Sequence, residues 1–281
     1  MTAPTVAPGA SAAPPGLPEA STWSAFRALL LRDLTVLDRD IKEFIPNTVL
    51  QPLLLVFIFT YVFPKIGQSV GGSDGAARFS TVLVGGIVAQ SVIFQGIFRV
   101  AIPLARELDV TNELEDRVMA PMPVALIGVE KIVSGALQSL FAGLIVFPVA
   151  AFVPATPIFV IVDWPVLLTI APLACISSAA LGLTLATRID PRSVPLLAGF
   201  IALPLGFFGA IFYPWDALAP IPWLKGAVLV NPLVYMSEGF RAGLSVGVPT
   251  MSLAVIYGVL ICFTVGLTWL GIRGFVQRVL S

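Results

Sequence analysis

The chain of 281 residues is 57% hydrophobic, has a mean hydropathy of +0.96, and carries 16 basic and 16 acidic residues. This apolar share exceeds that of soluble globular domains and predicts an integral membrane protein. Zero net charge gives no reason to expect nucleic-acid binding. Because the chain has no histidine, imidazole zinc sites and histidine-dependent acid–base catalysis are excluded, and neither a metal site nor enzymatic function is expected.

The N-terminal region divides into a tail and an amphipathic segment. Residues 1–20 are rich in proline and alanine and contain no Lys or Arg, which predicts a disordered tail. In residues 21–45 apolar side chains recur at three- and four-residue steps, which predicts an amphipathic helix lying in the membrane interface. A soluble helix packed on a partner is the alternative. The candidate interfacial residues, facing lipid, are Trp23, Phe26, Arg27, Arg32, Arg39 and Lys42.

Residues 46–281 form one predicted membrane domain, in an all-α fold. It contains six charge-free apolar stretches, each long enough as a helix to cross about 30 Å of hydrocarbon once tilt and polar flanks are allowed. The stretches are 47–63, 79–98, 132–153, 164–187, 193–213 and 249–272. The third can begin as early as Val124, which places Glu130 and Lys131 near its cytoplasmic end. An even number of spans places both termini on one side.

Basic residues predict which side that is, because cytoplasmic loops are enriched in Lys and Arg. With a cytoplasmic N-terminus, the cytoplasmic set is Arg27, Arg32, Arg39, Lys42, Arg106, Arg117, Arg188, Arg192, Arg273 and Arg278. The opposite set is then only Lys65, Arg78, Lys225 and Arg241. The asymmetry favours cytoplasmic N- and C-termini.

The linker 214–248 between the fifth and sixth spans contains two pieces too short to cross the membrane, near 223–230 and 232–244. We expect re-entrant helices in the outer leaflet, the alternative being an extracellular loop folded over the spans. Glu238 and Arg241, three residues apart, are placed to pair and anchor this hairpin at the outer surface, with a gating role as the alternative. The candidate hairpin residues are Asn231, Tyr235, Glu238 and Arg241.

A charged segment, residues 105–123, separates the second and third spans. Its ionised side chains cannot lie in hydrocarbon, so it must meet water or a partner. Leu104, Leu108, Leu114 and Val118 recur at near-helical spacing, which is typical of a short amphipathic helix that docks in a groove. A plain solvated loop is equally compatible with the charges. The charged residues are Arg106, Glu107, Asp109, Glu113, Glu115, Asp116 and Arg117.

The order of these parts, with 115–123 (EDRVMAPMP) after the second span and 231–244 (NPLVYMSEGFRAGL) before the sixth, resembles the type 2 ABC exporter permeases. The likeness is to their daunorubicin-resistance and nodulation-export branches and extends over nearly all residues from Trp23 onward. The charged segment lacks the glycine that many relatives carry there. No Gly-Lys pair of a P-loop occurs in the chain, so ATP must be hydrolysed by another polypeptide.

The resemblance implies a plasma (inner) membrane subunit of an ATP-driven exporter. Two such permeases, most simply a homodimer, would each dock on one of two cytoplasmic ATPase subunits, with the charged segment as coupling helix. ATP and Mg²⁺ would bind the ATPase, and this chain would hold no cofactor. The cargo would be an amphipathic drug, a lipid, or a glycolipid or polysaccharide. The implied translocation-path residues are Phe200, Phe207, Phe208, Phe212 and Tyr213.

Two other functional classes stay open at this point. One is an ion-coupled secondary transporter or channel without an ATPase partner, which the lack of acidic residues near the centre of the spans disfavours. The other is a membrane-bound enzyme or assembly scaffold, disfavoured by the missing histidine and by the absence of converging polar side chains in the spans.

Overall fold

The computed structural model describes residues 22–66, 72–109, 123–154, 158, 160–245 and 247–279. Within these ranges regular structure is helical, apart from an isolated bridge between Val160 and Ser245. The prediction of an all-α fold is therefore confirmed for this part of the chain. The tail predicted for residues 1–20 lies outside the described residues.

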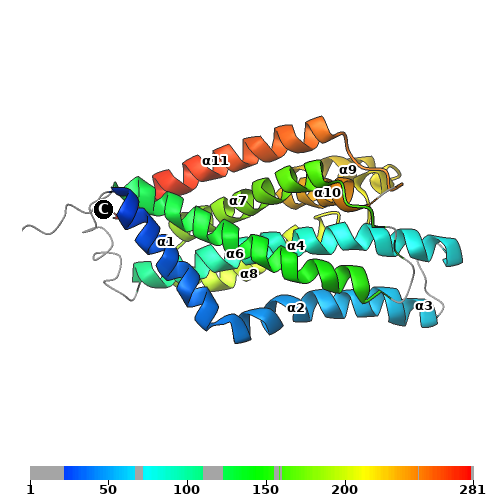
Figure 1. Cartoon of the computed structure of the whole chain (residues 1–281). Coiled ribbons are helices and arrows are strands. Elements are labelled where there is room, and N and C mark those ends of the chain that lie inside the picture. Colours follow the sequence, from blue (N-terminus) through cyan, green and yellow to red (C-terminus); the bar gives the residue numbers. More distant parts are fainter. Residues whose placement is uncertain are drawn as a thin grey trace, which may run out of the picture.

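Five helical segments of the described chain are long and apolar enough to cross a membrane. They run side by side along the long axis of the molecule (Figure 1). The helices that form them are α2 (Ile41–Phe57) with its extension through η1 (Ile58–Val62) and α3 (Phe63–Lys65), α4 (Gly72–Asp109), α6 (Val124–Phe152), α7 (Trp164–Arg188) and α11 (Leu253–Val279). The third span begins at Val124, the earlier of the two predicted starts.

Helix α4 is the centre of the bundle, packed against α6, α7 and α10 (Pro232–Leu244), and most of its apolar length is buried. Its contact with α7 is close because glycines face each other there. A Cβ added at Gly182 would lie 2.8 Å from the carbonyl oxygen of Ile97 and 2.9 Å from that of Gly96. Small residues at such crossings let helix backbones approach in a membrane bundle.

The helix predicted over residues 21–45 is divided at Asp40. Helix α1 (Thr22–Arg39) has no buried residue, whereas Phe44, in the first turn of α2, is fully buried against Phe141 of α6. Helix α1 meets α2 at an angle and lies along α6 (Figure 1). The apolar stripe that the sequence assigns to one helix thus belongs to two, and only the first part lies outside the long-axis bundle.

The predicted fifth span, 193–213, is not observed as a full-length helix. After a short turn, η2 (Pro191–Ser193), helix α8 (Val194–Phe207) has 14 residues. At 1.5 Å per residue it is about 21 Å long, less than the hydrocarbon thickness of about 30 Å. The chain then turns through Ala210, whose φ of 53° lies in the left-handed region. Five of the six predicted spans thus correspond to helices long enough to cross a membrane, and a crossing by the shorter α8 stays a prediction.

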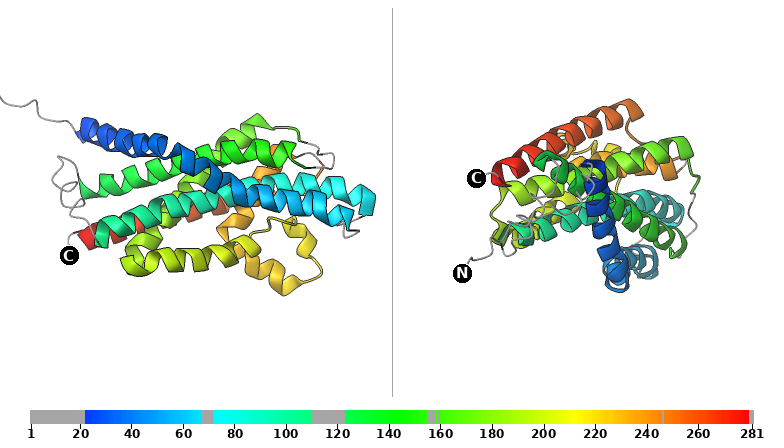
Figure 2. Two further views of the ribbon diagram at one scale, coloured as in Figure 1. Left: turned by 90° about the horizontal axis from the view of Figure 1, so that it is seen from below. Right: turned by 60° about the vertical axis from the view of Figure 1, so that its left-hand side comes forward.

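The chain between α8 and α11 folds into short helices: η3 (Trp215–Leu218), α9 (Pro222–Ala227), η4 (Val228–Val230) and α10. Helices thus occupy both pieces predicted at 223–230 and 232–244, while their depth in a membrane stays a prediction. They gather at one end of the bundle, and the start of α1 and the end of α11 lie together at the opposite end (Figures 1 and 2).

Candidate functional site

A buried ion pair holds α10 in the bundle. Arg241 and Glu238 are 0% and 1% exposed, and Nη1 of Arg241 lies 2.8 Å from Oε1 of Glu238. The predicted pairing is present and the pair is buried between helices, while the position of the hairpin at the outer surface of a membrane stays a prediction. Helix α10 starts where the sequence favours a start, because Asn231 accepts a hydrogen bond from the backbone N–H of Leu233 and Pro232 fills the first position.

Arg241 also supplies the hydrogen bonds that the ending of α8 removes. Past the end of a helix, backbone carbonyls lose their intrahelical partners and must be satisfied otherwise inside a membrane bundle. The guanidinium donates to the carbonyls of Ala210 and Ile211, the latter at 3.1 Å, and its Nε donates to Val82 of α4 at 3.2 Å. A Cβ at Gly86 of α4 would collide with the carbonyl of Ile211, so glycine is required at this crossing.

Two further side chains of the α10 segment complete this replacement. Ser237 donates to the carbonyl of Gly209 at 2.9 Å, and the amide of Asn231 donates to the carbonyl of Leu205 at 2.9 Å. Side chains of Asn231 and α10 thus bind the carbonyls of residues 205, 209, 210 and 211, which explains how an apolar helix can stop within the bundle.

Glu238 joins the two ends of the hairpin. Its Oε1 accepts a hydrogen bond from the backbone N–H of Trp215 at 2.8 Å, and its Oε2 accepts one from Met251 at 2.9 Å. Trp215 begins η3, after α8, and Met251 lies in the loop before α11.

The other hairpin residues add local contacts. The hydroxyl of Tyr235 donates to the carbonyl of Leu229 at 3.0 Å, and its ring lies near Phe263 of α11. Lys225 pairs with Asp216 at 2.7 Å on the exposed side of the hairpin. The four candidate hairpin residues therefore all take part in holding this end of the bundle together.

At the opposite end, an ion cluster joins three helices. Nζ of Lys131 in α6 lies 3.0 Å from Oδ2 of Asp33 in α1 and 3.2 Å from Oε1 of Glu107 in α4. The lysine side chain is 8% exposed, so the Lys131 cluster (Lys131, Asp33, Glu107) is partly shielded from water. It lies toward the end of the bundle where α4 ends at Asp109 and α6 begins at Val124.

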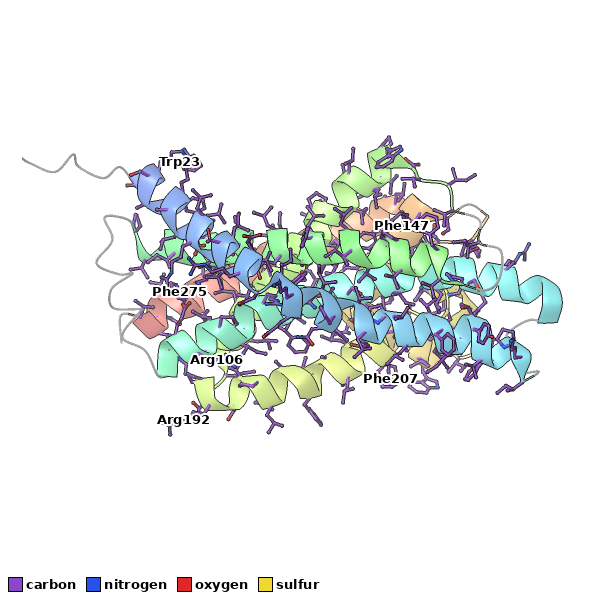
Figure 3. All side chains as sticks on the ribbon, turned by 60° about the horizontal axis from the view of Figure 1, so that its bottom comes forward. Trp23, Arg106, Phe147, Arg192, Phe207 and Phe275 are labelled. Atoms are coloured by element: carbon purple, nitrogen blue, oxygen red, sulfur yellow. The ribbon has the colours of Figure 1, made fainter. Side chains whose placement is uncertain are left out.

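The residues predicted to couple to an ATPase are described only in part. Arg106 is exposed near the end of α4 (Figure 3), and Glu107 belongs to the Lys131 cluster. Asp109 ends α4, and nothing is described of its side chain. Glu113, Glu115, Asp116 and Arg117 lie outside the described residues. A coupling helix over this segment stays a prediction.

The candidate interfacial residues lie on or next to α1. Trp23 is 72% exposed and its ring stacks on that of Phe26, with centroids 5.7 Å apart. The cations Arg27, Arg32, Arg39 and Lys42 are all exposed, the last of them on α2. An apolar side chain exposed beside cations is typical of an interfacial helix, and the membrane contact itself stays a prediction.

The candidate path residues separate into two groups. Phe200, Phe207, Phe208 and Tyr213 line a groove of about 520 Å³ on the side of α8, and the first two are 69% and 67% exposed. Figure 3 shows Phe207 at the end of this helix. Phe212 does not line this groove, because its ring packs against Phe59 at a centroid distance of 5.0 Å.

Arg99, Asp33 and Gln95 are not among the site residues predicted from the sequence. The predicted second span ends at residue 98, just before Arg99, although residues 100–104 continue as an uncharged, mainly apolar run. In the structure α4 runs through Arg99 to Asp109 without interruption. Among the described residues, no three His, Cys, Asp or Glu side chains gather as a metal site.

These features define a helical protein of the multi-pass membrane class: a bundle of long apolar helices, a hairpin held by a buried ion pair, and a charged opposite end. Residues 24–245 match the ABC-2 type transporter family, and the chain belongs to this family. It is 30% identical over 248 residues to the inner membrane transport permease YadH of Escherichia coli K12, an alignment that covers 86% of this chain and 91% of the relative. A permease of the same name from Shigella flexneri has the same identity and coverage.

The Lys131 cluster makes a testable prediction. Replacing Lys131 with methionine removes an ammonium group shared by two carboxylates, and hydrogen bonds to charged groups contribute about 1.5–3 kcal/mol each. We expect amide hydrogens of α1 to exchange at least about tenfold faster, because α1 loses its ionic link to α6. Hydrogen–deuterium exchange of the purified chain measures this. The matched control is Lys42→Met, which removes an exposed lysine. Equal exchange rates of the α1 amide hydrogens in the two variants would show that the Lys131 cluster does not hold α1 against α6.

Proposed function

We propose that this chain is the membrane subunit of an ATP-driven exporter that works with separate cytoplasmic ATPase subunits. Membership of the ABC-2 type transporter family supports the transport role. The need for a second polypeptide follows from the sequence, which contains no Gly-Lys pair of a P-loop. ATP and Mg²⁺ would then be bound by the partner, and this chain would supply the path and the docking surface.

The observation that carries the proposal is the Lys131 cluster beside the flanks of the charged segment. Asp33, Glu107 and Lys131 link α1, α4 and α6 where the chain enters and leaves residues 110–122. A displacement imposed on that segment by an ATPase would therefore reach three helices together. Such rigid-body movement between packed arrangements is a known way to pass a change between sites.

The groove along α8 supports a path formed with a second copy of this chain. Leu196, Phe200 and Phe207 are 77%, 69% and 67% exposed, so α8 presents a continuous apolar surface. In a homodimer two such surfaces would line an apolar route. It would suit an amphipathic drug, a lipid or the lipid part of a glycolipid or polysaccharide precursor, because the route offers no charge to compensate an ionic cargo.

The relative's description as an inner membrane permease supports the same location for this chain. Both described chain ends lie at one end of the bundle (Figure 1), as cytoplasmic N- and C-termini require. The excess of Lys and Arg on that side supports the orientation.

Purification from native membranes tests the proposal. The tagged full-length chain, extracted in a mild detergent, should retain a polypeptide that carries a P-loop, with two copies of each chain in the complex. Reconstituted together, the two should consume ATP during transport, and a Lys→Ala change in the partner's P-loop should abolish both. Transport driven by an ion gradient, with no ATPase bound, would overturn the proposal.

A further inference from the structure

A polar cavity of about 370 Å³ lies between α1, α4 and α6, apart from the apolar groove on α8. Its lining includes seven ionised side chains, four of them cationic and three anionic. These are Arg32, Arg99, Arg106 and Lys131 against Asp33, Asp40 and Glu107. Lys131 is bound by Asp33 and Glu107, and Asp40 is the carboxylate of the lining that interacts electrostatically with Arg99.

Arg99 is held in a fixed orientation on the wall of this cavity. Its Nε donates to Oε1 of Gln95 at 3.3 Å, and its guanidinium lies 4.5 Å from the centre of the Phe44 ring. Gln95 is itself fixed, because its amide donates to Thr48 of α2 at 2.9 Å. Within the described ranges, the bond from Nε is the only hydrogen bond that Arg99 makes, so its two terminal nitrogens keep their donors for another group.

The depth of Arg99 matches the headgroup boundary of a bilayer. The apolar part of α4, Ala77–Leu108, has 32 residues and is therefore about 48 Å long, about 9 Å longer than the hydrocarbon at each end when centred. Arg99 lies nine positions before Leu108, about 13 Å from that end. It is thus about 4 Å inside the boundary, within reach of a lipid phosphate through its long side chain.

We propose that this cavity binds the phosphate group of an anionic phospholipid, with Arg99 as the principal donor. A guanidinium offers a planar pair of donors that fits phosphate oxygens, and hydrogen bonds between ionised groups are stronger than neutral ones. Arg106, exposed near the end of α4 and part of the same lining, adds positive charge at the rim. Binding requires neither an ATPase nor transport, so the site goes beyond the proposed export function.

Binding of phosphatidylglycerol to the delipidated full-length chain, followed by native mass spectrometry, tests the site. The wild type should bind it, and Arg99→Gln should weaken binding by at least about tenfold, the factor that a charge-assisted hydrogen bond provides. Arg99→Lys keeps the charge and should restore part of the affinity. The matched control is Arg192→Gln, an exposed arginine at the same end, outside the cavity lining (Figure 3), and it should bind as the wild type does.

Competition experiments with two other ligands distinguish a lipid phosphate from free phosphate. Diacylglycerol, which has the same tails without phosphate, should not compete, and inorganic phosphate should compete only weakly. Equal phosphatidylglycerol affinity in Arg99→Gln and wild type, with the variant folded by thermal melting, would overturn the proposal. So would equal competition by diacylglycerol. If the chain binds inorganic phosphate but not the lipid, and Arg99→Gln abolishes that binding, the lipid assignment is overturned. Arg99 would then still be a hydrogen-bond donor to phosphate.

Discussion

Replacing Arg241 with methionine is expected to lower the free energy of unfolding by about 3–5 kcal/mol, the usual cost of removing one partner of a buried ion pair. Glu238, which is 1% exposed, would be left without its counter-ion. The carbonyls of Ala210, Ile211 and Val82 would lose the guanidinium that they share. Reversible unfolding of the purified chain in detergent, by denaturant titration, measures the difference.

The control is a second ion pair of the same hairpin. Asp216 is 66% exposed and pairs with Lys225, so Asp216→Ala should cost no more than about 1 kcal/mol, as exposed pairs do. The double change Glu238→Leu with Arg241→Met should be less harmful than Arg241→Met alone, since it leaves no buried unpaired charge. If Arg241→Met and Asp216→Ala unfold at the same denaturant concentration, the buried pair does not hold the hairpin.

Reversing three charges of the segment between α4 and α6 is expected to separate the chain from its ATPase. In Glu113→Lys, Asp116→Lys and Arg117→Glu together, each charge that faces a complementary group on the partner becomes repulsive, which costs several kcal/mol at an interface. The amount of copurifying ATPase and the rate of ATP-driven transport should both fall at least about tenfold. Membrane insertion should be unchanged, because the segment lies outside the spans.

A charge swap at the other end of the bundle controls for general effects of the mutations. Asp216→Lys with Lys225→Glu exchanges the members of an exposed pair and should leave ATPase binding at the wild-type level. If the triple variant retains both its ATPase and its transport rate, the segment 105–123 is not the docking site.

Local sequence features predicted most of the long helices, because a long apolar run has few alternatives in a membrane. The run predicted at 164–187 forms α7 (Trp164–Arg188), one residue longer. The family was also recognisable, from the order of the parts and the 231–244 motif, and the match over residues 24–245 confirms it.

The ending of α8 was not predictable in the same way. Residues 193–213 contain no charged side chain and are long enough to cross, so composition alone indicates a full span. What ends the helix is a donor 30 residues further along the chain: Arg241 binds the carbonyl of Ile211. The sequence shows that Glu238 and Arg241 are three residues apart, but not that α8 ends beside them.

The charged end was missed for a similar reason. Lys131 meets Asp33 across 98 residues and Glu107 across 24, so no local pattern connects them. Arg99 could not be predicted as part of the second span, because a charge normally ends an apolar span, whereas here the cavity beside α4 accommodates it. In both cases packing between distant helices decides where a charge is tolerated.

Photo-cross-linking from the charged segment tests the central claim most directly. A photoreactive phenylalanine analogue at Glu113 in the full-length chain, illuminated in native membranes, should form a cross-link to a P-loop ATPase that peptide sequencing identifies. The same analogue at Ile261, exposed on α11, should give no such product. An actively transporting protein that yields no ATPase cross-link from position 113, 115 or 116 would contradict the assignment of this segment as the coupling surface.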